Sequence, residues 1–258
     1  MPQSSSSGFF KRPGAPALYY QLNACGDAKG LVGLIHGFAE HSGRYDDLVR
    51  KLAAAGFSCL RYDLRGHGRS EGKPADVERF DDYVTDHQAL REYLRQQKLI
   101  PACALHLIAH SMGGLIALES ASRHAEWVAS LVLTSPCLSV TLSAPLKWAA
   151  RVIAIFAPGF YFSQPVAAGQ LSHDAAKVRE YLADPLIPKK ISARLLAALM
   201  QEGEYLVEKP LTLAAPVLML LAGSDRIVNN APALSLYERL KAPQKKIFVL
   251  EWFLQVVF

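Results

Sequence analysis

Short apolar runs that alternate with amphipathic segments constrain the fold of this chain more than any other feature. Several of these runs are almost continuously apolar, as strands are when helices cover both faces of a parallel sheet. The predicted strands span residues 17–22, 31–36, 58–63, 105–109, 130–134, 217–222 and 246–252. The predicted helices span residues 45–55, 80–97, 112–124 and 231–240. The alternation predicts an α/β fold, a mostly parallel sheet with helices on both faces.

Residues 137–215 break this alternation because they contain no clear strand. An insertion of this length between two strands is too long for a simple loop. Residues 146–157 and 191–201 fit helices with wide apolar faces. We therefore expect residues 137–215 to form a helical cap, inserted into a core domain made of residues 1–136 and 216–258.

Length and charge limit the possible functions. The 258 residues, 51% of them hydrophobic, are enough for one large domain with a sizeable core. The net charge is +5, but the basic residues are scattered and no run of five occurs. The pattern argues against nucleic acid as a partner. It leaves open a weak contact between the cap and an anionic membrane surface.

The N-terminal segment and the cysteines indicate a location. MPQSSSSGFFKRPG lacks the apolar core of a signal peptide, so we expect a short flexible lead. No apolar stretch reaches the roughly 18 residues that a membrane span needs. The cysteines form no CxxC pair, and we expect reduced thiols in a cytoplasmic compartment, with peripheral membrane contact left open. These cysteines are Cys25, Cys59, Cys103 and Cys137.

The strongest candidate for a catalytic residue is Ser111. The strand at 105–109 leads into Ala109-His110-Ser111-Met112-Gly113, and a predicted helix follows at once. A sharp strand-to-helix turn exposes a serine hydroxyl near a base and oxyanion donors, and small residues two positions either side let the backbones approach. Ala109 replaces the first glycine of the G-x-S-x-G pattern but is still small. The alternative is a serine that only caps the helix.

Two further loops follow strands that end at the same edge of the predicted sheet. HGFAEHSGRY spans residues 36–45, and DLRGHGRSEG spans residues 63–72. Open α/β sheets bind ligands at this edge, and the first loop can offer a backbone N–H beside that of Met112. Asp225 follows the predicted strand at 217–222, so the order serine, then aspartate, is that of α/β hydrolases. A turn aspartate is the alternative.

HGFAEHSGRY, DLRGHGRSEG and AHSMGG together resemble the monoacylglycerol lipase, or serine aminopeptidase S33-type, branch of the α/β hydrolases. The resemblance runs from about Tyr20 to about Phe253, and SHDAAKVREYLADPL is similar to a cap segment of that branch. It implies the α/β-hydrolase fold, with Ser111 as nucleophile and the N–H groups of Phe38 and Met112 as oxyanion hole. For His36, His41, Arg65 and His67 we favour structural roles. The other histidines are interpreted as surface or packing residues.

The same resemblance implies a histidine and a closing helix after the last strand, and neither is found. Gln255 stands at the register of that histidine, and no histidine follows His173. Glutamine has no titratable nitrogen and cannot accept the serine proton. We favour a truncation or frameshift near Phe253. The alternatives are a degenerate homologue retained for binding and rescue by another histidine, such as His36 or His41.

The resemblance implies hydrolysis of lipid-like carboxylic esters, such as monoacylglycerols or lysophospholipids, through an acyl-enzyme, and without the histidine we expect this activity to be impaired in this copy. Ser111 attacks the carbonyl carbon and Asp225 orients the missing histidine. No metal site or nucleotide loop is evident in the sequence, so we expect no cofactor. Apolar cap residues suit one acyl chain; these are Trp148, Ile153, Ile155, Phe156, Phe160, Tyr161 and Phe162. The alternatives are a non-catalytic lipid- or acyl-binding homologue and another α/β-hydrolase chemistry, such as that of a peptidase. The oligomeric state stays open.

Overall fold

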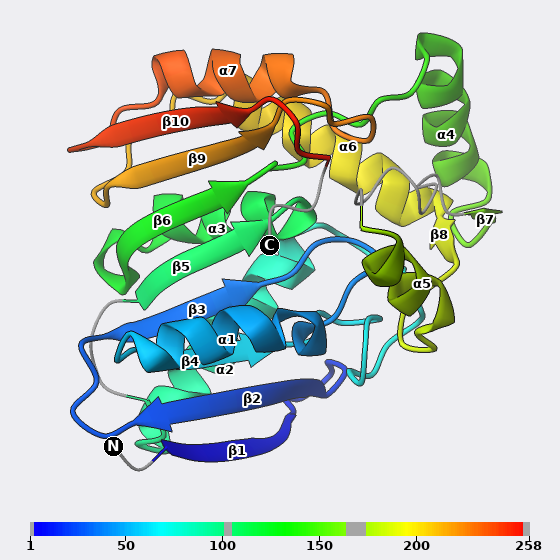
Figure 1. Ribbon diagram of the computed structural model, residues 1–258. Coiled ribbons are helices and arrows are strands. Elements are labelled where there is room, and N and C mark those ends of the chain that lie inside the picture. Colours follow the sequence, from blue (N-terminus) through cyan, green and yellow to red (C-terminus); the bar gives the residue numbers. More distant parts are fainter. Residues whose placement is uncertain (1–2, 101–104, 164–173, 255–258) are drawn as a thin grey trace.

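A computed structural model describes residues 3–100, 105–163 and 174–254. Its main sheet has eight strands in the order β1-β2-β4-β3-β5-β6-β9-β10 (Figure 1). They are β1 (Gln3–Phe10), β2 (Leu18–Cys25), β3 (Leu31–Ile35), β4 (Ser58–Tyr62), β5 (Leu105–His110), β6 (Val128–Thr134), β9 (Val217–Ala222) and β10 (Lys245–Leu250). β2 pairs antiparallel with β1 and β4, and every other neighbouring pair is parallel. The predicted mostly parallel α/β fold is confirmed, and the predicted strands differ from these by at most three residues at an end.

Helices lie on both faces of the sheet. The helices of the core are α1 (Asp46–Ala54), α2 (Asp81–Gln96), α3 (Met112–Arg123) and α7 (Asn230–Arg239), with short 3-10 turns at Ser42–Tyr45 and Ala125–Trp127. On one face, Val49 of α1 packs against Val32, Leu34 and Cys59. Residues of α2, α3 and α7 join the larger cluster on the other face. Burying both faces explains why the central strands read as continuous apolar runs.

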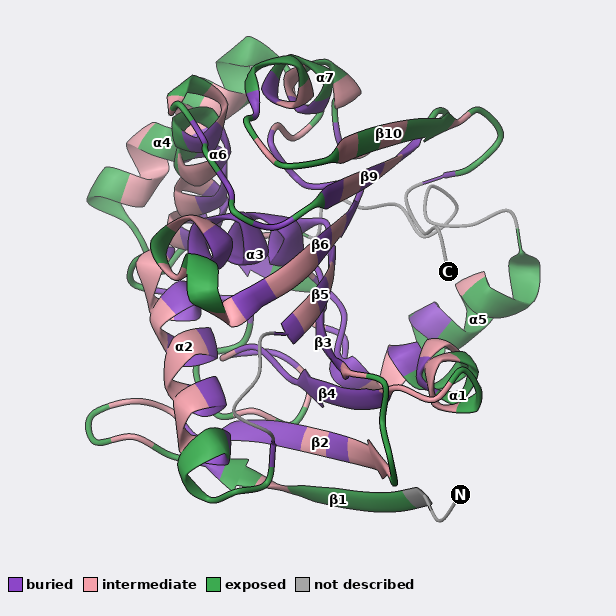
Figure 2. Cartoon of the chain, turned by 90° about the vertical axis from the view of Figure 1, so that its left-hand side faces the viewer, coloured by how far each residue is buried: buried purple, intermediate pink, exposed green. Residues whose placement is uncertain are grey.

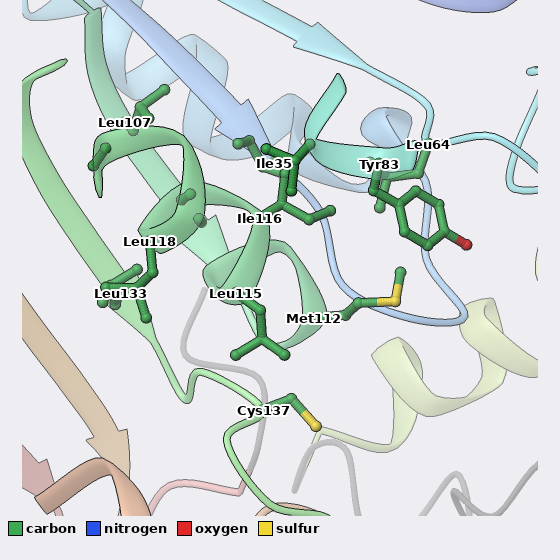
Figure 3. Close-up of a cluster of buried hydrophobic side chains, with 14 of the residues drawn as sticks. Ile35, Leu64, Tyr83, Leu107, Met112, Leu115, Ile116, Leu118, Leu133 and Cys137 are labelled. Atoms are coloured by element: carbon green, nitrogen blue, oxygen red, sulfur yellow. The ribbon is translucent and has the colours of Figure 1, made fainter. Parts of the chain in front are cut away.

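The largest apolar cluster surrounds α3. Met112, Leu115, Ile116 and Leu118 of this helix are fully buried against strands β3, β5 and β6 (Figure 3). A helix that is buried nearly all round is held rigidly by its neighbours. The core therefore fixes the turn that precedes α3, which carries Ser111.

The N-terminal segment is not the flexible lead that the sequence predicts. Residues Gln3–Phe10 form β1, which pairs antiparallel with β2 along the full length of both strands, from Gln3 opposite Cys25 to Phe10 opposite Leu18. Phe10 is buried in the main core. The four serines of β1 hide the strand signal, because strands are usually recognised by β-branched and aromatic residues.

The segment between β6 and β9 contains more than the two predicted helices. It holds α4 (Ala144–Phe156), β7 (Tyr161–Ser163), α5 (Ala175–Ala183), β8 (Lys190–Ser192) and α6 (Ala193–Glu208), and β7 pairs antiparallel with β8. The apolar face of α6 is buried in the main core, where Leu195, Leu199 and Leu206 lie. The apolar face of α4 is mostly exposed (Figure 2). No helix of the described residues is long and apolar enough to cross a bilayer.

The cap aromatics are not gathered into an enclosed acyl site. Trp148, Phe156 and Phe160 have exposed fractions of 68%, 83% and 52%. Phe162 packs against the main core instead. The expectation that this set lines one acyl-chain pocket therefore fails for its most exposed members, because α4 turns Trp148 and Phe156 toward solvent and the segment after it leaves Phe160 exposed.

Candidate active site

Ser111 lies in the sharp turn between β5 and α3, as predicted. Its backbone has φ 51° and ψ −118°, a conformation that costs energy for a residue with a side chain. Three backbone hydrogen bonds hold it there. The Ser111 N–H donates to Thr134 O at 3.0 Å, and Ser111 O accepts from Gly114 N at 2.9 Å and from Cys137 N at 3.1 Å. The strained conformation is thus fixed by β6 and by the first turn of α3.

The small residues around Ser111 are required by close backbone approach. A Cβ on Gly113 would lie 2.4 Å from Ile35 O and 2.5 Å from His36 O, so only glycine lets α3 approach the end of β3. A Cβ on Gly37 would lie 3.0 Å from the Ser111 Cβ. Ala109 is buried within β5 and keeps a negative φ, so its methyl group is accommodated. The replacement of the first glycine by Ala109 leaves the turn intact, as expected.

The predicted oxyanion donors lie on the two segments that meet at Ser111. Phe38 follows β3 and Gly37, whose backbone approaches the serine. Met112 is the first residue of α3 and is fully buried. The N–H of a first helical residue has no acceptor within its helix. Neither of these two N–H groups is a donor in the loop and turn hydrogen bonds of the described part of the chain. Both N–H groups therefore have no acceptor in these loop and turn bonds.

The buried carboxylate of Glu40 shapes the loop that carries Phe38. Glu40 Oε2 accepts hydrogen bonds from Gly37 N and Tyr45 Oη, both at 3.0 Å. Burial alone would raise the pKa of Glu40, but His110 and the Gly37 N–H favour its charged form, so its pKa is lowered. Sequence reasoning missed this role. A carboxylate in a glycine-rich loop after a buried strand is the signal that could have found it.

Asp63 joins the two loops that the sequence analysis singled out. Its Oδ1 accepts from Ser42 N and its Oδ2 from Arg69 N, each at 2.7 Å. A Cβ on Gly68, which has φ 56°, would lie 2.2 Å from Asp63 Oδ2. This contact explains one glycine of DLRGHGRSEG. Asp63 itself was quoted in the motif, but its function as a link between the loops is visible only in three dimensions.

His36 and His41 use both ring nitrogens in structural contacts. In His36, Nε2 accepts from Leu64 N at 2.9 Å and Nδ1 lies 2.7 Å from Gly37 O. In His41, Nδ1 accepts from Gly43 N at 3.2 Å, and Nε2 lies 2.8 Å from Asp184 Oδ2. Burial lowers the pKa of His36. These contacts support loop-shaping roles and leave neither ring placed as a base for Ser111.

His67 and Arg65 also have structural contacts. Arg65 makes a two-pronged ion pair with Asp86 of α2, at 2.6 and 2.7 Å. His67 Nδ1 lies 3.1 Å from Arg65 O, and its ring contacts the Phe38 ring edge-on. Burial, reinforced by His36, lowers the pKa of His67 to about 3. A ring that is so hard to protonate is a poor proton acceptor at neutral pH.

His110, interpreted from sequence as a surface or packing residue, is fully enclosed beside Ser111. Its Nδ1 lies 2.9 Å from Thr134 Oγ1 and 3.1 Å from Thr134 O. It favours the charged forms of both Glu40 and Asp225. The surface interpretation is wrong for His110 because β5 extends one residue further than predicted and carries this ring inside.

Asp225 lies on the turn directly after β9, as predicted. Its Oδ1 accepts hydrogen bonds from Ile227 N and Val228 N, both at 2.8 Å. Its Oδ2 is buried and has no hydrogen-bond partner among the residues that the structure describes. Burial raises the pKa of Asp225 although these two N–H groups oppose the shift. Leaving a buried carboxylate oxygen without a hydrogen bond is costly.

Cys137 connects Ser111 with Asp225. Its thiol hydrogen-bonds with the Ser111 side chain, and the charge of Asp225 acts on it. Burial, with Asp225, raises the pKa of this thiol to about 12, so it stays protonated. Figure 3 shows Cys137 at the edge of the core cluster, below Leu115 and Met112. The sequence placed this cysteine in the core but gave no sign of its contact with the serine.

Some predicted residues lie outside the described ranges. These are Gln255, His173 and Cys103. The structure therefore brings together Ser111, Phe38, Met112 and Asp225 at one edge of the sheet and is silent on the position of Gln255.

Known proteins are similar to this chain in sequence and in fold. A family model described as "Serine aminopeptidase, S33" matches residues 26–254. A monoacylglycerol lipase of Mycolicibacterium smegmatis is 31% identical over 217 residues, covering 83% of this chain and 76% of that protein. The human monoglyceride lipase is 31% identical over 230 residues, covering 88% and 75%. The crystal structure of the Paleococcus ferrophilus monoacylglycerol lipase matches with a TM-score of 0.79 at 27% identity, covering 97% of this chain and 89% of that one.

Proposed function

The chain belongs to the serine aminopeptidase S33 family of α/β hydrolases, and on this basis we propose that it is a carboxylic ester hydrolase acting on lipid-like substrates. Its relatives are described as monoacylglycerol and monoglyceride lipases, which supports an ester of one acyl chain as the substrate class. One observation carries the proposal. Ser111 is held in a strained turn by three backbone bonds, beside two N–H groups that can bind an oxyanion.

In the proposed reaction, the Ser111 Oγ attacks the ester carbonyl carbon, its proton passes through a base to the departing alkoxide, and the alcohol leaves, so that an acyl-enzyme forms. The N–H groups of Phe38 and Met112 stabilise the negative oxygen of the tetrahedral intermediate. Asp225 Oδ2 is the acceptor for the N–H of an imidazole, which would satisfy the buried oxygen and stabilise the imidazolium. Water then hydrolyses the acyl-enzyme by the reverse proton transfers.

The general base limits the rate in this proposal. His36 and His41 are engaged on both nitrogens, and His67 resists protonation. Gln255, at the family register of the histidine, has no titratable nitrogen. We therefore expect slow acyl transfer, since an incomplete triad retains only about 10³–10⁴-fold catalysis over water.

The domain boundaries, the membrane contact and the cellular compartment are parts of the same proposal. We retain a cap of residues 137–215 between core segments 1–136 and 216–258, and within it α4 offers exposed apolar side chains to a membrane surface. Among the described cysteines, Cys25, Cys59 and Cys137 carry free thiols. Free buried thiols support a reducing, cytoplasmic compartment.

A fluorophosphonate probe tests the nucleophile. The chain should be labelled slowly, Ser111→Ala should not be labelled, and Ser224→Ala should be labelled like the parent. Ser224 is the matched control because it lies one residue from Asp225 and is exposed, with its hydroxyl donating to Glu251 O at 2.8 Å. Labelling that survives Ser111→Ala would refute the assignment of the nucleophile.

Gln255→His tests the base. Combined with a grafted family-like C-terminal helix, which holds the loop in place, this substitution should raise hydrolysis of a p-nitrophenyl ester by the roughly 10²–10⁴-fold that a positioned general base contributes. The gain should disappear when Ser111→Ala is added. Ordinary enzyme rates in the unaltered chain would show that another base is present. Monoacylglycerol binding without any Ser111 labelling would favour the non-catalytic lipid-binding homologue.

A further inference from the structure

β10 is an unusually apolar edge of the main sheet. It pairs only with β9 among the described residues. Phe248 and Val249 have exposed fractions of 53% and 48%, and Trp252, just beyond the strand, is 84% exposed (Figure 2). At the opposite edge, half of the residues of β1 are serines. Sheet edges usually carry charges, proline or a bulge against further pairing, and the centre of β10 has none of these.

The ladder with β9 shows which main-chain groups of β10 point outward. Val217 N donates to Gln244 O and Gly223 N to Leu250 O, both at 2.9 Å. In a parallel pair this pattern turns the groups of residues 246, 248 and 250 toward β9. The N–H and C=O groups of Ile247 and Val249 therefore point away from the sheet, in position to pair with another strand.

The sequence of β10 complements itself in one antiparallel register. Outward-pointing residues must face each other, so the twofold axis must pass through a residue position of the strand. An axis at Phe248 places Ile247 opposite Val249 of the second copy and brings Lys245 toward its Glu251, which lies in the turn just beyond the end of β10. An axis at Ile247 would set Lys245 against Val249. An axis at Val249 would set Ile247 against Glu251. Only the axis at Phe248 pairs opposite charges.

We propose that β10 pairs antiparallel with β10 of a second copy of this chain, with the twofold axis at Phe248. Each Ile247–Val249 pair then exchanges both of its N–H···O bonds. The two exposed Phe248 rings meet at the non-hydrogen-bonded position, where side chains approach most closely and aromatic pairs are favourable. The Lys245 ammonium, held near the end of α7 by Tyr237 O at 2.7 Å, faces the exposed Glu251 of the second copy.

Sedimentation velocity over a wide concentration range tests the pairing. A pair of single strands makes a small interface, so we expect a dimer that dissociates on dilution. Val249→Pro removes an outward N–H and leaves the ladder to β9 intact, because proline is tolerated where an edge strand faces solvent. This variant should be monomeric. Val249→Thr keeps the N–H with a similar shape and should still dimerise.

Charge exchange tests the register. Glu251→Lys sets Lys opposite Lys245 twice across the axis and should weaken dimerisation by about tenfold or more. Lys245→Glu should do the same, whereas the double variant Lys245→Glu/Glu251→Lys should regain the parent affinity. A mixture of the two single variants should form heterodimers, since every facing pair is then opposite in charge.

Two results would overturn the proposal. One is a chain that stays monomeric at all concentrations. The other is a dimer that survives Val249→Pro or ignores the charge exchange, since the contact would then lie elsewhere. Melting curves of each variant show whether a loss of dimer reflects unfolding. The proposal is independent of catalysis, so Ser111→Ala should dimerise like the parent.

Discussion

Buried histidines beside the site are stable only as neutral rings. Burial, helped by His36, lowers the pKa of His67 to about 3, and burial, helped by Arg91, lowers that of His87 to about 4. His87 is also stacked on the Tyr62 ring. In the unfolded chain both rings take up a proton near pH 6.5. Above this pH the rings are neutral in both states. Below it the unfolded state binds more protons than the folded state, so the free energy of unfolding decreases as the pH is lowered.

We predict that His67→Gln flattens this pH dependence. Removing one ring should reduce the slope of the unfolding free energy by about 1.4 kcal/mol per pH unit. For His67 the change should extend from about pH 6.5 to about 3, and for His87→Gln only to about 4. Urea unfolding at a series of pH values measures the slopes. Identical slopes in parent and variants would contradict burial as the cause.

At the scale of elements, the apolar side chains of α4 should carry any contact with lipid. Trp148 and Phe156 are exposed, and Lys147 and Arg151 lie on the same helix. We predict that Trp148→Ser with Phe156→Ser lowers binding to vesicles of mixed neutral and anionic phospholipid by tenfold or more, because burying one such side chain contributes about 1.5–3 kcal/mol. Co-sedimentation with the vesicles measures the binding. Phe9→Ser, at the far sheet edge, is the matched control and should bind like the parent.

Elements with a local signal could be predicted, and those that depend on distant partners could not. The central strands are visible because both faces are buried, and Ser111 and Asp225 follow from their places after β5 and β9. β1 was not predicted because its serines have no strand signal of their own and form a strand by pairing with β2. α4 and α6 have similar apolar faces, but only α6 finds a core to cover it. The roles of Glu40 and Asp63 were missed because their carboxylates accept from backbone N–H groups several residues away, or in another loop, which only the folded chain brings close.

At the scale of the whole molecule, the site residues follow strands that differ in how well neighbouring strands enclose them. Ser111 follows β5, which has a neighbour on each side, and lies above the fully buried α3. Asp225 follows β9, next to the edge strand. Its loop is tied to the end of β10, where Gly223 N donates to Leu250 O at 2.9 Å and Ser224 N to Phe253 O at 3.0 Å. Asp225, the proposed acid, is thus held by the less enclosed half of the sheet.

Native-state hydrogen exchange should report this difference. Segments with exposed backbone bonds and few buried contacts open at a smaller free-energy cost than global unfolding. In the dilute monomer, amides of Phe248 and Leu250 should exchange faster than those of Leu107 and Leu131, which lie in the centre. Equal protection would show that the sheet opens only as a unit. If β10 opens alone, the carboxylate of Asp225 leaves the site while the fold survives, and heat inactivation then measures the opening of one strand.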